Sequence, residues 1–575
     1  MTQEGRLSRA NVFITGFSGA GKTTVGRRVA RILDWRFVDT DEEIVEVSGK
    51  PIAVLFEEEG EAVFRRLESE RLSRVCEGDG QVVSTGGGLP MDERNRRLME
   101  SNGVIVCLEA APSTIHRRLF AEVGAGTRPM LDAPDPLRRI EALKSERQPG
   151  YALAHWTVHT DHMMPGEVAA EVVRAWRVLT RTPADGRILL SERAEPVAPE
   201  EGPQSADAGG VDEEDLAATV RTSSGDYPIW VGWGTLAGLG GMVRRVLDPP
   251  AAYVVTDTGA YRHARRAVAS LEAARVPTHV FVVPPGETSK TLEMARRLYE
   301  WLASHKAERG HLVLAVGGGV VGDLAGYAAA TFLRGVPFGQ VPTSLLAMMD
   351  AAVGGKTGVD LREGKNLVGA FHQPCFVLED VQTLETLPAR ELASGWAEAI
   401  KHGLILDEGL LRTFESDREA IVSLDRRVST DVIRRSVAVK AGVVSLDEKE
   451  TLGVRVLLNY GHTIGHGIEA ATGYGRYLHG EAVSIGMMGA AAIGASLGLM
   501  PDSDVERQQA VLEAYGLPVS LDDVDLDAVS EAMTLDKKTT AGSIRWVLLD
   551  GIGRAVTRGD VPQAVVDGAL RGLRA

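Results

Sequence analysis

The stretch from Asn11 to Leu33 constrains the fold of this chain most, because it prescribes a strand, a loop and a helix in that order. Asn11–Thr15 is a short apolar run with strand preference. The segment after the loop carries apolar residues at helical spacing, namely Val25, Val29, Ile32 and Leu33. Between the two lie residues 16–23, GFSGAGKT, with the spacing G-x-x-x-x-G-K-T. In this context the spacing predicts a P-loop, whose backbone N–H groups and helix N-terminus bind phosphates.

The side chains of this loop have distinct expected tasks. Lys22 is expected to reach the outer phosphates of a nucleotide, and Thr23 is expected to hold Mg²⁺. The full set of expected nucleotide-binding residues is Gly16, Gly19, Gly21, Lys22, Thr23 and Thr24. The alternative is a Gly-rich turn that contains lysine and threonine by chance.

Five motifs in a fixed order follow the P-loop. Residues 37–41, FVDTD, end a second strand-like run with two carboxylates two apart, which point the same way on an extended segment. The later motifs are Gly60-Glu61 with Phe64-Arg65-x-x-Glu68, then VVSTGGG at 82–88, Thr127-Arg128-Pro129, and Arg147-x-Pro149-x-Tyr151. This ordered set resembles shikimate kinase, a small nucleoside-monophosphate-kinase-like fold, over nearly all of residues 8–178.

The resemblance implies a role for each of these polar residues. Asp41 would bind and activate the shikimate hydroxyl, while Asp39 would position the Mg²⁺ shell. Arg65 and Arg147 would clamp the substrate carboxylate, since a guanidinium fork matches that group in geometry. Arg128 would belong to a lid over ATP and act in catalysis with Lys22 and Asp41. The pocket would be completed by the backbone of Gly86, Gly87 and Gly88.

Residues 180–219 differ in character from what precedes them. They are rich in Pro, Ala, Glu, Asp and Gly and nearly free of aromatics, a composition that buries too little apolar surface to order itself. They predict a flexible acidic linker between a domain at 1–179 and another at 220–575. The alternative is a pair of short helices anchored on a neighbour by Leu189, Leu190 and Leu216.

The composition of the whole chain excludes several classes of protein. At 575 residues the chain exceeds what one hydrophobic core usually serves, so two or three domains are expected. No apolar run approaches the roughly 20 residues of a membrane span, and the start lacks a signal-peptide pattern. Three cysteines without paired spacing fit a reducing compartment, so we expect a cytoplasmic protein. The net charge of −16 argues against a nucleic-acid or membrane surface.

The second half begins as an α/β pattern. Ala252–Thr256, Val280–Val283 and Leu312–Val316 are each predicted to form a buried strand, and their alternation with helical segments indicates a parallel sheet. The third run continues into residues 317–323, GGGVVGD, which contain G-x-G-x-x-G. This is weak evidence alone and follows a late strand, but it allows close backbone approach to a pyrophosphate, so a dinucleotide is the expected ligand.

Residues 459–481, NYGHTIGHGIEAATGYGRYLHGE, concentrate three histidines. His462 and His466 lie four apart and would share one face of a helix, and His479 follows a Gly-rich turn. Neutral imidazoles held by a helix and a returning loop suit a zinc-type ion with an open coordination position. The alternative is a set of ordinary buried or surface histidines.

Many cations surround this stretch in a chain of net negative charge. They imply a densely anionic substrate such as a phosphorylated sugar acid, and the alternative is a set of surface salt pairs. The cations and the polar residues between them include Arg334, Asp350, Lys356, Lys365, Asn366, Lys401, Lys440, Arg455, Asn459 and Lys537.

The second half resembles 3-dehydroquinate synthase, one of the sugar phosphate cyclases, over roughly residues 220–575. The matching pieces include GETSK, GGGVVGDLAG, GKNLVGAFHQP, GWAEAIKHG, LNYGHTIGH and LHGEAV. The resemblance implies an α/β NAD-binding part at about 220–385 and a mainly helical part at 386–575. It implies Zn²⁺ or Co²⁺ ligands at Glu398, His462 and His479, with His466 handling protons and His402 not a ligand.

The same resemblance implies the cofactor, the substrate and the reaction. NAD⁺ would be bound by Asp257, Glu287, Lys290, Gly318, Gly319, Val320, Asp323, Thr343 and Ser344. The substrate site would be lined by Arg334, Asp350, Lys356, Lys365, Asn366, Lys401, Lys440, Arg455, Asn459 and Lys537. The catalytic residues would be Asp350, Lys356, Lys401, Lys440, Arg455, Asn459 and His466. The substrate would be 3-deoxy-arabino-heptulosonate 7-phosphate, oxidised transiently by NAD⁺ so that phosphate can leave, and then closed to 3-dehydroquinate.

The expectation for the whole chain is therefore a bifunctional shikimate-pathway enzyme whose two steps are not consecutive. A homodimer formed through the second half is a further hypothesis. Alternatives for that half are another sugar phosphate cyclase or an iron-group alcohol dehydrogenase. The first half could instead be a nucleotide-sensing module, although its intact Lys22, Asp39, Asp41 and Arg65 oppose this.

Overall fold

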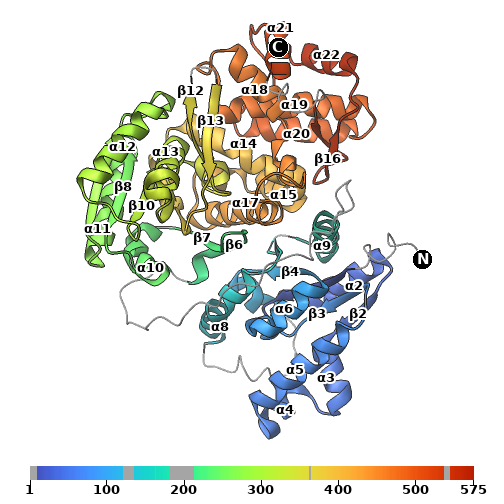
Figure 1. The fold of residues 1–575 in the computed structure, drawn as a ribbon. Coiled ribbons are helices and arrows are strands. Elements are labelled where there is room, and N and C mark those ends of the chain that lie inside the picture. Colours follow the sequence, from blue (N-terminus) through green and yellow to red (C-terminus); the bar gives the residue numbers. More distant parts are fainter. Residues whose placement is uncertain are drawn as a thin grey trace. The chain divides into compact units, whose positions relative to one another are not determined.

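The computed structural model of the protein describes residues 10–120, 135–161, 163–180, 211, 213–361, 364–535 and 544–574. The chain divides into two compact units (Figure 1). The first comprises residues 1–205 and 212–216, and the second comprises residues 206–211 and 217–575. Each unit has its own sheet and core, as the two sequence patterns predict.

The described residues of the first unit form a parallel five-stranded sheet in the order β2-β3-β1-β4-β5. The strands are β1 Asn11–Gly16, β2 Arg36–Asp39, β3 Gln81–Ser84, β4 Gly103–Glu109 and β5 Trp156–His159. β1 and β4 are buried along their whole length, because helices cover both faces of the sheet.

The helices of this unit lie between successive strands, except α9, which follows β5. They are α2 Lys22–Leu33, α3 Thr40–Ser48, α4 Ile52–Glu59, α5 Glu61–Val75, α6 Glu93–Asn102, α7 Pro112–Phe120, α8 Pro136–Tyr151 and α9 Pro165–Leu179. The helix expected after the P-loop is present, but only Val25 and Val29 of its apolar set are buried, and Ile32 is half exposed. The prediction that Asp39 and Asp41 lie on one extended segment is wrong. Asp39 ends β2 and caps α3, so Asp41 lies in the first turn of the helix.

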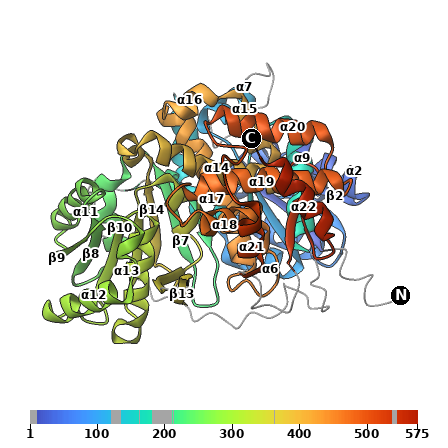
Figure 2. The ribbon, with the colours of Figure 1, turned by 90° about the horizontal axis from the view of Figure 1, so that it is seen from above.

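The described residues of the second unit form a seven-stranded sheet in the order β6-β7-β14-β11-β10-β8-β9, parallel from β7 to β9. The strands are β6 Leu216–Val220, β7 Tyr227–Gly232, β8 Ala252–Asp257, β9 Thr278–Val283, β10 Leu312–Gly317, β11 Phe338–Pro342 and β14 Phe376–Asp380. Helices α10 Leu239–Val246 and α11 Tyr261–Ala273 pack on one face, and α12 Leu292–Ser304 and α13 Gly319–Thr331 pack on the other (Figure 2).

Two expectations about this sheet need correction. Val280–Val283 lies in β9, but β9 is an edge strand, and Val280 and Val282 are 37% and 42% exposed rather than buried. The expected linker at 180–219 is too long at its end, because Leu216–Val220 forms strand β6 beside β7, with four of its five residues buried. Its alternation of small and apolar side chains suits an edge strand despite the acidic residues just before it. Residues 181–210 and 212 of that stretch lie outside the described residues.

The rest of the second unit is mainly helical, as the resemblance implied. Its helices are α14 Ala389–Leu406, α15 Glu408–Ser416, α16 Arg418–Val422, α17 Arg426–Leu446, α18 His462–Ala471, α19 His479–Ser496, α20 Asp502–Ala514, α21 Leu526–Leu535 and α22 Gln563–Gly572. Two antiparallel hairpins accompany them, β12 Lys356–Leu361 with β13 Gly364–Phe371, and β15 Trp546–Leu549 with β16 Ala555–Arg558. Among the residues that the structure describes, no helix is long and apolar enough to cross a membrane.

Candidate active sites

The P-loop connects β1 to α2, and three of its positions suit only glycine. Gly16, Gly19 and Gly21 have φ values of 129°, 86° and 100°, and a Cβ on Gly16 would lie 2.3 Å from the carbonyl oxygen of Leu108. Lys22 Nζ donates to the carbonyl oxygens of Gly16 and Phe17, at 2.8 and 3.0 Å. The loop therefore approaches its neighbours through backbone and keeps its ammonium beside the start of α2.

The hydroxyl of Thr23 joins the loop to β2. Its Oγ1 donates to Asp39 Oδ2 at 2.7 Å, and Asp39 Oδ1 accepts the backbone N–H of Asp41 at 3.1 Å. The expected Mg²⁺ residues Thr23 and Asp39 are thus in contact, at the N-termini of α2 and α3. Thr24, also expected at the nucleotide, is exposed in the first turn of α2.

Residues 86–88 lie at the centre of a second cluster in the first unit. A Cβ on Gly86 would lie 2.9 Å from Asp41 Oδ1, one on Gly87 would lie 3.4 Å from Arg147 Nη1, and one on Gly88 would lie 2.3 Å from Arg65 Nη1. A side chain at any of the three would crowd these groups. The residues expected to bind shikimate therefore do converge, whereas Arg128 lies outside the described residues.

Glu68 is a member of this cluster that the site prediction omitted. Its Oε2 accepts from Arg65 Nη1 at 2.6 Å, and a Cβ on Gly86 would lie 2.2 Å from its Oε1. Burial raises the pKa of Glu68 to about 7, although the Arg65 guanidinium works in the opposite direction. The sequence signal for Glu68 is its i, i+3 spacing from Arg65, which makes the two side chains neighbours on one helix.

The expected NAD-binding residues gather at the carboxyl ends of β8, β10 and β11. Asp257 ends β8, and its Oδ1 accepts the N–H of Ala260 at 2.8 Å. Gly318 precedes α13, Gly319 and Val320 begin it, and Thr343 follows β11 with its N–H bonded to the Gly317 carbonyl at 2.9 Å. The expected Ser344 lies beside them, with Oγ 3.4 Å from where a Cβ on Gly318 would be.

Three charged residues of the expected NAD set form an ion-pair chain. Lys290 Nζ is 2.6 Å from Asp323 Oδ2 and 3.7 Å from Glu287 Oε1. Burial raises the pKa of Asp323 to about 6, with Lys290 opposing the shift. Because glycines and a helix N-terminus meet at the carboxyl end of a parallel sheet, this edge is suited to a phosphate-containing ligand.

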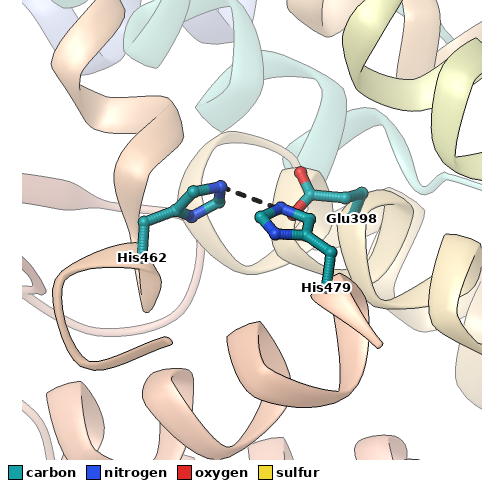
Figure 3. A group of neighbouring side chains, drawn as sticks. All are labelled: Glu398, His462 and His479. Atoms are coloured by element: carbon teal, nitrogen blue, oxygen red, sulfur yellow. Dashed lines mark ion pairs between the residues drawn. The ribbon is translucent and has the colours of Figure 1, made fainter. Parts of the chain in front are cut away.

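The expected metal ligands come together from three helices. Glu398 lies in α14, His462 begins α18 and His479 begins α19. The Nε2 atoms of His462 and His479 are 3.7 and 3.9 Å from Glu398 Oε1, and the ligand atoms of the trio all lie within 4.8 Å of one another. Figure 3 shows both rings directed toward the same carboxylate.

The surroundings of Glu398 and His462 suit metal binding. Glu398 is fully buried, and its Oε1 accepts no hydrogen bond from any described residue. Burial holds the pKa of His462 well below its usual range, with the Lys401 ammonium acting in the same direction, so the imidazole is neutral. A neutral imidazole and an ionised carboxylate are the forms that bind Zn²⁺.

The other two histidines near the trio differ in their surroundings. His466 is exposed, one turn after His462, with ring centroids 5.4 Å from His462 and 6.1 Å from His479. His402 is buried one turn from Glu398, but its Nδ1 lies 2.7 Å from the Ser436 hydroxyl. His402 therefore belongs to the packing between α14 and α17.

The cations of the second unit hold carboxylates and carbonyls around the metal ligands. Lys401 Nζ donates to Glu398 Oε2, and Lys440 Nζ donates to both the carbonyl and Oδ1 of Asp350. Arg455 Nη1 donates to the carbonyls of Glu448 and Gly354, at 2.8 and 3.3 Å.

Glu450 is a second group that the prediction omitted. Its Oε1 is 2.6 Å from Lys356 Nζ and 3.6 Å from Arg455 Nε, so one carboxylate faces two expected substrate cations. Glu450 also has a φ of 57°, which is uncommon for a residue other than glycine. The sequence carried no signal for this pairing, because Lys356 and Glu450 come from distant segments.

Five expected substrate residues remain, and the structure describes four of them. Lys365 Nζ is 4.6 Å from the centre of the Tyr474 ring, and Asn366 has a φ of 56°. Asn459 ends the 3₁₀ turn that begins at Arg455. Arg334 is exposed, with a φ of 68°, and makes no ion pair with any part of the chain that the structure describes. Lys537 lies outside the described residues.

Comparison with known proteins assigns both units. The shikimate kinase family model matches residues 18–177, and the models for the N-terminal and C-terminal parts of 3-dehydroquinate synthase match residues 280–394 and 395–539. The 3-dehydroquinate synthase of Thermoanaerobacter pseudethanolicus is 43% identical over 338 residues, which are 59% of this chain and 95% of that protein. The enzyme of Symbiobacterium thermophilum is 45% identical, over 60% of this chain and 98% of that protein.

Solved structures resemble the second unit in fold. The 2-epi-5-epi-valiolone synthase of Streptomyces hygroscopicus, with NAD⁺ and Zn²⁺ bound, aligns with a TM-score of 0.55 and 30% identity, over 60% of this chain and 96% of that one. A 2-deoxy-scyllo-inosose synthase complexed with carbaglucose-6-phosphate, NAD⁺ and Co²⁺ aligns with the same TM-score and 27% identity, over 62% of this chain and 99% of that one.

A P-loop kinase domain and an α/β-plus-helical domain with a metal-ligand trio thus occupy one chain. The chain belongs to the 3-dehydroquinate synthase family and carries a shikimate kinase domain before it. It is accordingly a kinase and a carbon–oxygen lyase, as the sequence predicted. Among the alternatives raised for the second half, the match to the synthase models and relatives favours 3-dehydroquinate synthase.

Proposed function

We propose that the second unit converts 3-deoxy-arabino-heptulosonate 7-phosphate to 3-dehydroquinate and phosphate, at a metal bound by Glu398, His462 and His479. The single observation that carries this is the Glu398 carboxylate, which is buried with an oxygen lacking a described partner and faced by two imidazole nitrogens. Leaving such an oxygen unsatisfied costs about 1–3 kcal/mol or more. The donor set of two nitrogens and one oxygen fits a catalytic Zn²⁺ or Co²⁺ ion.

The residues around the trio fit NAD⁺ and an anionic sugar acid. Bound there, the ion would polarise a substrate hydroxyl and NAD⁺ would supply reversible hydride transfer. The glycine turn before α13 lets the backbone approach a pyrophosphate closely. Arg455, which is nearly fully buried, and Lys356 present cations to the substrate anions.

Four further residues would orient the substrate and its surroundings or move its protons. Lys440 and Asp350 hold each other in one geometry beside the trio. His466 is exposed next to both ligand histidines and can exchange protons with the reacting atoms. Lys401, which donates a hydrogen bond to Glu398 directly, orients that carboxylate.

The charge on Lys440 gives the synthase a predicted alkaline limit. Burial lowers the pKa of Lys440 to about 8, while Asp350 opposes the shift. The ammonium is therefore present below about pH 8 and lost above it, and its pairing with Asp350 is lost with it. We expect kcat/KM for the heptulosonate phosphate to fall above about pH 8, as measured by phosphate release.

Two comparisons make this prediction specific. The rate of shikimate phosphorylation by the same sample should not show this fall, because Lys440 belongs to the other unit. In Lys440→Arg, if active, the fall in kcat/KM should move to higher pH, since a guanidinium keeps its charge. If the fall stays at the same pH in this variant, it belongs to another group.

For the first unit, we propose that ATP and Mg²⁺ bind the P-loop and that shikimate binds the cluster around residues 86–88. Arg65 and Arg147 would grip the substrate carboxylate, and Asp41 would receive its hydroxyl. Phosphoryl transfer depends on positioning and charge neutralisation more than on covalent chemistry, and the Thr23–Asp39 contact supplies a place for Mg²⁺. Assaying the purified chain with each substrate separately, alongside metal analysis, tests both halves of the proposal.

We propose domain boundaries from the same division of the chain. The kinase domain would end near residue 179, and the synthase domain would begin before β6 rather than at residue 220. The burial of β6 in the synthase sheet supports the earlier start. A synthase fragment that begins at residue 221 should therefore be less stable than one that begins at residue 206, in a thermal unfolding comparison.

We propose that the protein is a cytoplasmic homodimer joined through the synthase unit. The hairpin of β12 and β13 exposes Leu367 and Phe371, by 59% and 49%, at alternate positions of one strand. Exposed apolar side chains on one strand face favour a protein contact. Light scattering should give about twice the chain mass of 61.6 kDa, and Leu367→Asp with Phe371→Asp should give the single-chain mass. A wild-type protein of single-chain mass would contradict the dimer.

A further inference from the structure

The three ligands of the proposed metal site differ in what holds each one in place. Glu398 Oε2 is held by Lys401, and His462 Nδ1 lies 3.3 Å from the backbone carbonyl of Tyr460. His479 Nδ1 instead lies 3.4 Å from Glu469 Oε2. Among the contacts of the described residues, His479 is the one of the two histidines that a side chain orients, and that support can be removed by substitution.

Glu469 is built into the site rather than placed on the surface. It lies near the end of α18, which packs against the helix that His479 begins, and it is only 7% exposed. A carboxylate can only accept hydrogen bonds, so the imidazole must donate from Nδ1. The lone pair of His479 is then fixed on Nε2, which is the nitrogen directed toward Glu398.

We propose that Glu469 is a positioning residue for the metal site, which fixes the tautomer and the ring orientation of His479. This inference rests on the proposed metal-dependent function of the second unit. A carboxylate behind a ligand histidine also increases the electron density that the ring offers to a metal. Glu469 touches neither substrate nor metal in this role and acts only through His479.

A different use of the same residues gives a distinct prediction. The ligand atoms of His466, Glu469 and His479 also lie within 4.8 Å of one another, so Glu469 could itself bind a second ion. One ring nitrogen cannot both donate a proton to Glu469 and bind a metal. The positioning role therefore requires one ion per chain, whereas the alternative requires two.

The test uses the full-length protein stripped of metal and reloaded with Co²⁺. Wild type should bind one ion, and Glu469→Leu should bind it about 100-fold more weakly, in line with the 10- to 100-fold effect of such partners. Glu469→Gln should lose about 10-fold, because its amide oxygen still accepts from Nδ1 but without charge. Competition with a chelator gives the affinities, and the Co²⁺ absorption bands, which report ligand geometry, should shift in the leucine variant.

A matched control is available at the start of the same helix as His479. Glu481 accepts the backbone N–H of Leu478 at 2.8 Å and pairs with Arg390, so it supports the helix without facing the ring. Glu481→Gln should keep the Co²⁺ affinity within threefold and leave the bands unchanged. Shikimate phosphorylation and thermal unfolding of the metal-free forms show whether each variant is folded, and the glutamine variant serves if the leucine variant is not.

Each remaining outcome has a definite reading. Wild-type affinity and unchanged bands in a folded Glu469→Leu protein would overturn the inference, and so would two ions per wild-type chain falling to one in this variant. If the wild-type chain took up no ion at all, the proposed metal site would be wrong and the inference would fall with it. If wild type and the Glu481 control bind normally while Glu469→Leu does not, the inference stands.

Discussion

His462→Ala should remove the bound metal and reduce synthase activity by at least about 10³-fold, because an ion that polarises a substrate oxygen contributes several kcal/mol and each 1.4 kcal/mol is tenfold. The variant deletes one of two imidazoles that face the unpartnered oxygen of Glu398. Metal content measured on the dialysed protein and phosphate release from the heptulosonate phosphate check the two parts of the expectation.

The chain offers a matched control for this result. His402 is also a buried histidine, one turn from Glu398, but its ring faces the hydroxyl of Ser436. His402→Asn keeps a polar atom near that hydroxyl and should retain the metal. Full synthase activity in a metal-free His462→Ala protein would end the assignment of His462 as a ligand.

Lys22→Ala should reduce ATP-dependent shikimate phosphorylation by at least about 10²–10³-fold, the usual loss when one preorganised donor to a developing charge is removed. The ammonium lies beside the start of α2, held by two carbonyls of the loop. No other described lysine shares this contact with Gly16 and Phe17. A coupled assay of ADP release measures the effect.

The same variant tests whether the two activities are independent. Phosphate release from the heptulosonate phosphate should remain within about threefold of wild type, because the chain divides into two compact units with separate sheets. Lys50→Ala, which removes a half-exposed lysine paired with Glu58 and Glu59, should leave both activities unchanged. Loss of both activities in Lys22→Ala would contradict independence.

Local patterns predicted the parts of the sites that depend on short segments. The P-loop follows from residues 11–33 alone, because strand, glycine turn and helix N-terminus are adjacent in the chain. The helical spacing of His462 and His466 was also readable, since i, i+4 residues share a face. Asp41 shows the limit of such reasoning, because Asp39 caps a helix and so ends the extended run two residues earlier than expected.

Three acidic groups were not among the predicted site residues. Glu68 pairs with Arg65 at i, i+3 spacing on one helix, and that spacing is readable from the sequence. Glu450 and Glu469 each meet a cation or an imidazole of an expected site, but as lone acids in sequence they resemble solvated surface residues. The end of the linker was mispredicted for a related reason. Leu216–Val220 is too short to be recognised as a strand from its sequence, and it forms one only beside β7.

The sequence by itself determined which chemistries the chain carries, because phosphate-binding loops and metal-binding histidines need particular residue types at particular spacings. Only the tertiary structure decided which partners complete them. It joins Glu398 to His462 and His479 from three helices, and it directs Glu469 to the far side of the His479 ring. Those contacts depend on how α14, α18 and α19 pack, and packing between distant segments is not encoded in any local spacing.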